Sequence, residues 1–255
     1  MIMEQKLLKV AATLKVLRYL ATSESNVDIR STAQILGITT STAKRIFSTL
    51  VDEDFATSST NTLHYYLGPQ AFQLSAVIKK AMPMARVAQP ILHKLADKTG
   101  ESVSLNVFQP NTDYALCVGV AESTRPLQCV IEIGEKKLLH VGASGKTILA
   151  FLPKLHRNEV LRMNSLEKFE PSSDFMKNML RQLSTVRKQG YCITKGERLP
   201  GALGIGVPIF DSENAVTASL VVTIPTSYFC ASDKARLVAI LKHHSLLLSK
   251  KLGSS

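Results

Sequence analysis

The sequence predicts an α+β protein that combines a small helical head with a larger part built on an antiparallel sheet. Two observations support this prediction. Helical patterns and one hairpin pattern occupy residues 1–68, whereas about six strand patterns alternate with helices beyond residue 84. The chain has 255 residues, of which 45% are hydrophobic, so it is long enough to form two cores. We therefore expect domains at residues 1–68 and 84–255, joined by a segment at 69–83.

The chain is strongly basic. It carries 31 Lys and Arg against 20 Asp and Glu, a net charge of +11, and its sequence pI is about 9.6. Polyanions such as nucleic acid or a membrane surface are therefore candidate partners. Residues 1–80 hold 9 Lys and Arg against 6 Asp and Glu, so only +3 of the charge lies in the head. The net charge thus supports nucleic-acid binding by the head only weakly.

Neither a targeting segment nor a membrane span is predicted. The start, MIMEQKLLKV, lacks the apolar centre of a signal peptide. No run approaches the roughly 18 apolar residues that a membrane span needs. We therefore expect a soluble, cytoplasmic protein with no membrane partner.

The four cysteines form no C-x-x-C pair and lie mostly in apolar segments that resemble strands. They are Cys117, Cys129, Cys192 and Cys230. We expect small buried side chains, not disulfides, metal ligands or nucleophiles. The histidines show no metal-ligand spacing either, so we predict no metal and no cofactor.

The head contains three helical patterns. Apolar residues at helical spacing over residues 7–21 predict a first helix that covers the next two. Asp28 is a suitable N-cap for the second helix, and Gly37 supplies the positive φ that ends it. Thr39 or Thr40 caps the third.

Two different faces are predicted for the third helix. At 100° per residue, one face collects the apolar side chains Ala43, Ile46, Phe47 and Leu50. The opposite face collects Ser41, Lys44, Arg45 and Ser48. Short hydroxyls and two cations suit the phosphates and base edges of a major groove. For this segment alone, a solvated amphipathic helix is an equally good interpretation.

The context of this helix strengthens the first interpretation. Residues 55–67 alternate loosely, have Ser, Thr and Asn at their centre, and indicate a hairpin. Three helices followed by a hairpin form a winged helix-turn-helix. A helix is then predicted up to Pro83, and such a linker can fix the spacing between two heads in a dimer.

Strands and helices alternate beyond the linker. Strands are expected at 102–108, 114–121, 127–133, 191–194, 203–210 and 215–224. Helices are expected at 87–100, 176–190 and 237–252, and a Gly-rich loop at GASGKT passes into another. This loop is not a nucleotide-binding P-loop, because the Gly required five places before Gly145 is His140. Its free N–H groups would still form a cradle for an anion such as a ligand carboxylate.

Taken together, the chain resembles the IclR family of bacterial transcriptional regulators. The similar stretches are TTSTAKRIFSTLVDEDF, YYLG, TGESVSLNVF, LLHVGASGKTILA, RKQGY and GVPIFD. They occur in the family's order over nearly all of residues 7–252, and this joint order is specific. The resemblance implies a winged helix-turn-helix head and a GAF-like effector-binding domain. It also implies homodimers or homotetramers that repress or activate, for instance, a catabolic operon under control of a small organic molecule.

The resemblance also implies which residues contact double-stranded operator DNA. By position, these are Thr40, Ser41, Thr42, Lys44 and Arg45 of helix 40–51. Helix geometry adds Ser48, and the wing adds Asn61 and His64. Arg45 matches the family's usual Arg. Asp54 stands where the family usually has Gly, so we expect a different turn into the wing.

An effector pocket is implied between the Gly-rich loop and the sheet. Its expected residues are Ala143, Ser144, Thr194, Gly204, Val221 and Thr223. Members that bind small oxo-acids tend to carry an acid, a Cys and two Ser at the last four positions, and this chain does not. We therefore expect a roomier, less polar pocket for a small organic acid of aromatic or sugar-acid type.

Two other functions are alternatives for this sequence. A small-molecule enzyme could use Cys129 or Cys192 with His140, but no sequence signature supports that pairing. A purely architectural DNA-binding protein would not need a second domain with a Gly-rich loop. We therefore expect a ligand-responsive transcription factor and no enzyme.

Overall fold

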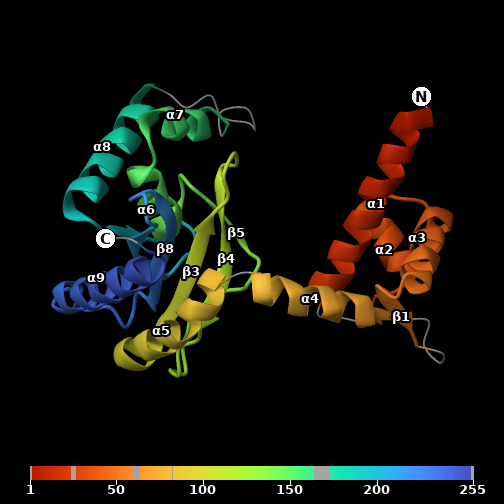
Figure 1. Ribbon diagram of the computed structural model, residues 1–255, viewed down its shortest axis with the longest axis horizontal. Helices are drawn as coiled ribbons and strands as arrows, with labels where there is room; N and C mark the ends of the chain where they lie inside the picture. Colours follow the sequence, from red (N-terminus) through yellow and green to blue (C-terminus); the bar gives the residue numbers. More distant parts are fainter. Residues whose placement is uncertain (1, 24–26, 60–63, 82, 164–172, 254–255) are drawn as a thin grey trace. The chain divides into compact units, whose positions relative to one another are not determined.

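The computed structural model describes residues 2–23, 27–59, 64–81, 83–163 and 173–253. The chain divides into two compact units, Met1–Met82 (unit 1) and Pro83–Ser255 (unit 2), coloured red to orange and yellow to blue in Figure 1. Within the described ranges, no helix combines the length and hydropathy that a membrane span requires.

Unit 1 is a winged helix-turn-helix followed by a further helix, as the sequence predicts. Its elements are α1 (Ile2–Thr22), α2 (Ile29–Leu36), α3 (Thr40–Asp52), β1 (Ala56–Ser58), β2 (Tyr65–Leu67) and α4 (Pro69–Ala81). The two strands pair antiparallel, with Ala56 opposite Leu67. The predicted hairpin is therefore present on both sides of residues 60–63, which lie outside the described chain.

The predicted caps mark both ends of α2 and the start of α3. The Asp28 side chain accepts hydrogen bonds from the backbone N–H groups of Arg30 (2.7 Å) and Ser31 (3.0 Å). Hydrogen bonds with Ser31 also lower the pKa of Asp28. Gly37 has φ +64°, a left-handed conformation that glycine adopts without steric cost. Thr39 then caps α3 by accepting from the N–H of Thr42 at 3.2 Å.

The core of unit 1 lies under α3. Phe47 is fully buried and stacks on Tyr65, with 4.1 Å between ring centroids. α1 covers this core through its later residues, Val16 and Leu20. Its earlier apolar residues, Val10 and Leu14, are about 60% exposed. Only the later part of the predicted helix therefore covers the core.

Unit 2 is an antiparallel sheet with helices on both faces. Its elements are α5 (Pro83–Thr99), β3 (Ser102–Phe108), β4 (Tyr114–Ala121), β5 (Lys136–Leu138), α6 (Gly142–Phe151), α7 (Lys154–Met163), α8 (Ser173–Gln189), β6 (Cys192–Lys195), β7 (Ala202–Phe210), β8 (Val216–Pro225) and α9 (Asp233–Lys251). The strand order is β5-β4-β3-β8-β7-β6, and every pair is antiparallel. α5 and α9 pack together on one face, whereas α6 and α8 lie on the other (Figure 1).

One predicted strand is wrong. Residues 127–133 form no strand, and the sheet instead takes up residues 136–138 as β5. The alternating burial is still present, because Cys129 and Ile131 are buried while Val130 is exposed. Backbone bonds to β4 begin only where Gly134 and Cys117 meet, with the Gly134 N–H donating to the Cys117 carbonyl at 2.7 Å. Extended residues without a neighbouring strand cannot complete a ladder.

The GASGKT stretch is not a loop, contrary to our expectation. α6 begins at Gly142, so Ala143 and Ser144 belong to its first turn. α6 can begin there because β7 offers glycine where the two elements meet. A Cβ on Gly206 would lie 2.6 Å from Thr147 Oγ1 and 2.8 Å from the carbonyl oxygen of Ala143. This close approach brings the start of α6 directly onto the sheet.

All four cysteines are free. Cys117, Cys129 and Cys192 are buried, in accordance with the prediction. The expectation is wrong for Cys230, which is exposed because it lies in the connection between β8 and α9 and not in a strand.

Candidate functional site

α3 presents a polar face to solvent. Four apolar side chains, at positions 43, 46, 47 and 50, are buried, as helix geometry requires. The six candidate residues of this helix are all exposed: Thr40, Ser41, Thr42, Lys44, Arg45 and Ser48. The Thr42 hydroxyl also shares a hydrogen bond of 2.8 Å with the Thr39 hydroxyl, so it belongs partly to the cap. Ser41, Lys44 and Arg45 thus project from α3 on the side away from its buried face.

Two candidate residues, Asn61 and His64, belong to the predicted hairpin. Asn61 lies outside the described residues. His64 is half-buried, and its Nδ1 is buried without a hydrogen-bond partner among the described residues. Before β1, Asp54 has φ +57°, in the left-handed region where an L side chain is strained. The turn therefore keeps a glycine-type backbone although the residue is Asp.

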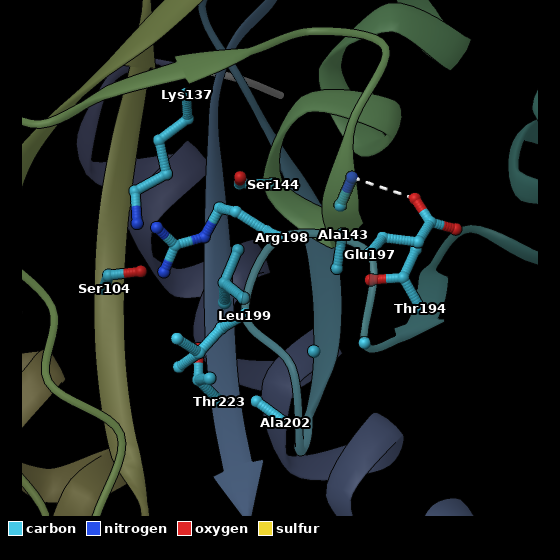
Figure 2. A pocket seen from close by; sticks show the side chains of 14 residues that line it. Ser104, Lys137, Ala143, Ser144, Thr194, Glu197, Arg198, Leu199, Ala202 and Thr223 are labelled. Atoms are coloured by element: carbon cyan, nitrogen blue, oxygen red, sulfur yellow. Dashed lines mark hydrogen bonds between the residues drawn. The ribbon is translucent and has the colours of Figure 1, made fainter.

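The six expected pocket residues lie together in unit 2. Ala143 and Ser144 come from α6, Thr194 from β6, Gly204 from β7, and Val221 and Thr223 from β8 (Figure 2). Together they line a cavity of about 30 Å³ that opens to solvent on one side. The pairing of β6, β7 and β8 brings these distant positions together, since Gly204 is opposite both Thr194 and Thr223.

Charged residues that the sequence did not single out also line this pocket. Lys137 enters from β5, and Glu197 and Arg198 enter from the β6–β7 connection. In Figure 2 the ends of Lys137 and Arg198 lie side by side above Ser104. The residue types Lys136, Lys137 and Leu138 do not alternate, so no sequence signal places Lys137 on the inner face. Only the burial pattern of the three-residue strand shows it.

These charges correct our expectation of a less polar pocket. The six family positions are weakly polar, as read from the sequence, yet the pocket contains an ammonium, a guanidinium and a carboxylate beside them. It is not roomy either, because the side chains of Arg198 and Leu199 extend into it (Figure 2).

The expected anion cradle at the start of α6 is occupied by the protein itself. The Gly142 N–H donates to Glu197 Oε2 at 3.0 Å. Lys146, on the next turn, donates to Glu197 Oε1 at 2.7 Å and to Gln182 Oε1 at 2.8 Å. A carboxylate is favoured at a helix N-terminus and beside an ammonium group. Glu197 therefore takes the place that we had assigned to a ligand carboxylate.

The Cys–His pairings considered for an enzyme have unsuitable chemistry. Burial raises the pKa of the Cys192 thiol to about 12 and also raises that of Cys129. Burial lowers the pKa of His140. A nucleophilic cysteine needs the opposite environment, one that stabilises the thiolate. In the described residues, no group of three or more His, Cys, Asp or Glu side chains is arranged to hold a metal.

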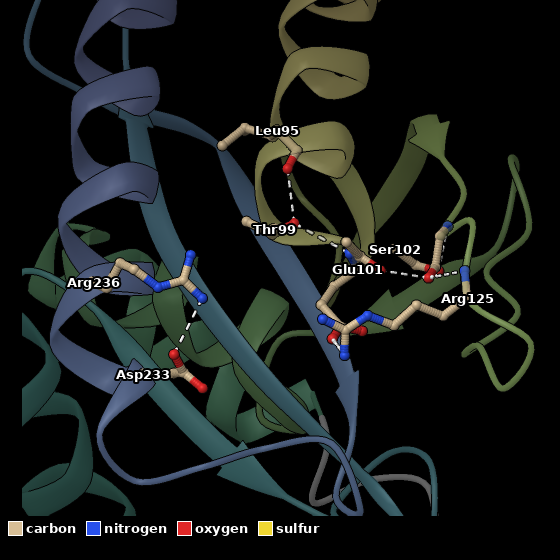
Figure 3. A network of polar contacts seen from close by, with 9 residues as sticks. Leu95, Thr99, Glu101, Ser102, Arg125, Asp233 and Arg236 are labelled. Atoms are coloured by element: carbon tan, nitrogen blue, oxygen red, sulfur yellow. Dashed lines mark hydrogen bonds and ion pairs between the residues drawn. The ribbon is translucent and has the colours of Figure 1, made fainter.

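A second polar network lies outside the pocket, at the TGES stretch (Figure 3). Glu101 is 3% exposed and pairs with Arg125 at 2.9 Å. Its Oε2 is buried without a hydrogen-bond partner among the described residues. Thr99 donates to the carbonyl of Leu95 and accepts from the Glu101 N–H, which closes α5 onto β3. This arrangement joins elements of the fold.

Comparisons with known proteins agree with this architecture. The sequence profile described as "Bacterial transcriptional regulator IclR C-terminal" matches residues 76–250. The HTH-type transcriptional regulator BhcR of Paracoccus denitrificans is 29% identical over 208 residues, 79% of this chain and 72% of the relative. The Transcriptional repressor IclR of Escherichia coli is 25% identical over 215 residues, 84% of this chain and 78% of the relative. A crystal structure of an IclR transcriptional regulator from Alicyclobacillus acidocaldarius is 27% identical, covers 95% of this chain and 97% of its own, and has a TM-score of 0.78.

Proposed function

The chain belongs to the IclR family of bacterial transcriptional regulators, and from this premise we propose how it reads operator DNA and binds its effector. It is a ligand-responsive DNA-binding regulator, and not an enzyme. In our proposal, residues 1–68 form the DNA-binding domain and residues 84–255 the domain that binds a small organic acid. Residues 69–83 link the two domains.

The observation that carries the DNA-binding part is the exposed face of α3. Ser41, Lys44 and Arg45 project from a helix whose other face is anchored by buried Phe47. A rigid helix with two cations and a hydroxyl on its free face suits a major groove, where phosphate contacts position the protein and base contacts give specificity. Thr40, Thr42 and Ser48 flank this set and are proposed to contact the DNA backbone, together with His64 and Asn61 of the wing.

A second copy of the chain is the proposed partner of α4. Leu74, Val77 and Ile78 share one side of this helix and are 50%, 62% and 46% exposed. Three neighbouring apolar side chains in water are typical of an interaction surface. Pairing of two copies would present two α3 helices to two half-sites of an operator. A homodimer, or a homotetramer built from two of them, is therefore the assembly that we propose.

Mobility shifts on the DNA that flanks the chain's own coding region test the proposal. We expect a sequence-specific complex at physiological salt that a small organic acid strengthens or dissolves. Scrambled DNA of equal length serves as the control, because phosphate contacts alone would bind both fragments equally. Equal binding of the two fragments, or no binding even at low salt, would contradict the proposal.

A further inference from the structure

Two cations in the pocket share one carboxylate. Lys137, whose side chain is 3% exposed, lies 3.3 Å through its Nζ from Glu135 Oε2. Arg198 donates from Nη1 to the other oxygen, Glu135 Oε1. Each of the two Glu135 oxygens thus meets one cation. An ammonium has three N–H donors and a guanidinium five, so both groups keep donors for a second anion.

The second carboxylate at the pocket, Glu197, does not neutralise Lys137 or Arg198. Glu197 uses one oxygen for Lys146 and the other for the Gly142 N–H. Around the pocket, Lys137, Lys146 and Arg198 therefore face two carboxylates, which leaves one excess positive charge. An uncompensated charge in a largely buried place is costly. One further negative charge would neutralise the group.

Hydroxyl groups surround the same place. Ser104, Ser144, Thr194 and Thr223 line the pocket, and none of its fourteen lining residues is aromatic. Deeper on the same face of β3 and β8, Asn106 and Ser219 are opposite each other and fully buried. Asn106 Oδ1 and Ser219 Oγ have no hydrogen-bond partner among the described residues, whereas the Asn106 amide donates to Ser104 at 3.2 Å. Buried polar atoms of this kind need hydrogen-bond partners.

We propose that the effector is a hydroxylated monocarboxylic acid of the aldonic type, whose carboxylate binds Lys137 and Arg198 beside Glu135. Its hydroxyl groups hydrogen-bond to Ser104 and Thr223. This inference rests on the proposed function, because it concerns the same pocket. One carboxylate neutralises the excess charge, whereas a dicarboxylate would leave a negative charge in its place. An aromatic acid would bring a ring to a wall of hydroxyls.

Calorimetry on the full chain tests the ligand class. The probes are the aldonates erythronate, ribonate and gluconate. Three acids serve as comparisons: hexanoate lacks hydroxyl groups, benzoate is aromatic, and galactarate carries a second carboxylate. Two or three hydroxyl hydrogen bonds correspond to at least about tenfold in affinity, so we expect one aldonate to bind that much tighter than every comparison acid. Equal or tighter binding of a comparison acid, or no binding by any aldonate, would overturn the inference.

Substitutions test the assigned groups. Arg198→Gln and Lys137→Gln are expected to weaken binding of the best aldonate about tenfold or more. Lys195→Gln and Lys136→Gln, at exposed neighbouring positions, are the matched controls and should leave it unchanged. Because Lys137→Gln could unfold the chain, Thr223→Val is the additional variant. It should weaken aldonate binding but not the residual binding of hexanoate; unchanged aldonate affinity in Arg198→Gln and Thr223→Val would refute the assignment.

Mobility shifts without acid and with each probe acid separate this inference from the proposed function. Absence of specific DNA binding under all of these conditions would refute the proposed function itself. Specific DNA binding that responds to hexanoate, benzoate or galactarate more strongly than to the aldonates would refute only the ligand class.

Discussion

At the scale of single residues, Arg45 is the side chain on which operator specificity should depend most. It is exposed on α3, and its backbone carbonyl accepts a hydrogen bond from the Thr49 hydroxyl at 3.1 Å. If the guanidinium contacts a base, Arg45→Ala should weaken operator binding by about 1–3 kcal/mol in a mobility shift at fixed salt. Arg181→Ala, an exposed Arg on α8, controls for lost charge. Equal effects of the two substitutions would remove Arg45 from the reading face.

Asp54 carries a conformational cost that glycine would relieve. Its φ of +57° is unfavourable for an L residue, and its backbone bonds to Val51 and Gln70 do not need a side chain. Asp54→Gly should therefore raise the free energy of unfolding by about 0.5–1 kcal/mol. Urea unfolding measures this. Glu53→Gly, one residue earlier at φ −96°, should have the opposite sign. A loss of stability in Asp54→Gly would contradict the argument.

Glu101 should make stability depend on pH. Burial raises its pKa above the ordinary value of 4.5, and Arg125 opposes this only in part. The native state thus holds the proton more tightly than the unfolded chain, so the contribution of Glu101 to stability falls as pH rises from 4.5 through the folded-state pKa. Glu101→Gln should gain relative to the parent chain over this window in urea unfolding. Glu122→Gln, at an exposed position, should show no such gain; a pH-independent difference for Glu101→Gln would refute the prediction.

At the scale of elements, the contact between α6 and β7 shapes the pocket. A Cβ at Gly206 would lie 2.6 Å from Thr147 Oγ1 and 2.8 Å from the Ala143 carbonyl oxygen. A Cβ at Gly204 would have one tight contact, 3.0 Å from the Ala143 methyl group. Gly206→Ala should therefore cost about 1–3 kcal/mol of stability through overpacking. Gly204→Ala should cost less, because a methyl contact is easier to relieve. Chemical denaturation compares them, and the reverse order would contradict this packing argument.

Pairing with β4 explains why the strand at 127–133 was predicted wrongly. Residue alternation there is that of a strand, and Cys129 and Ile131 do face inward. A strand also requires a neighbour at ladder distance, and backbone hydrogen bonds between this segment and β4 begin only at Gly134. Local pattern decides which side chains turn inward, whereas backbone pairing depends on the path of distant residues.

At the scale of the whole molecule, the exposed apolar side of α4 predicts self-association. Val77→Asp places a charge among Leu74 and Ile78 and should reduce the mass measured by light scattering towards that of a single chain. Ala76→Asp, on the opposite side of α4, adds the same charge and should leave the mass unchanged. A monomeric parent chain, or an unchanged mass for Val77→Asp, would refute the proposed pairing through α4.

The sequence by itself determined the order of helices and hairpin in the head, the caps at Asp28 and Gly37, the two faces of α3 and most of the strands. All of these follow from residue type and period, which act over a few neighbouring residues. It also supplied six pocket positions through family resemblance. Only the tertiary structure decided the charge of that pocket, because Lys137 of β5 and the pair Glu197 and Arg198 of the β6–β7 connection are far apart in the sequence and meet only in the folded unit. The start of α6 was decided in the same way: Glu197, fifty-five residues later in the chain, fills the anion cradle that the local sequence had left open.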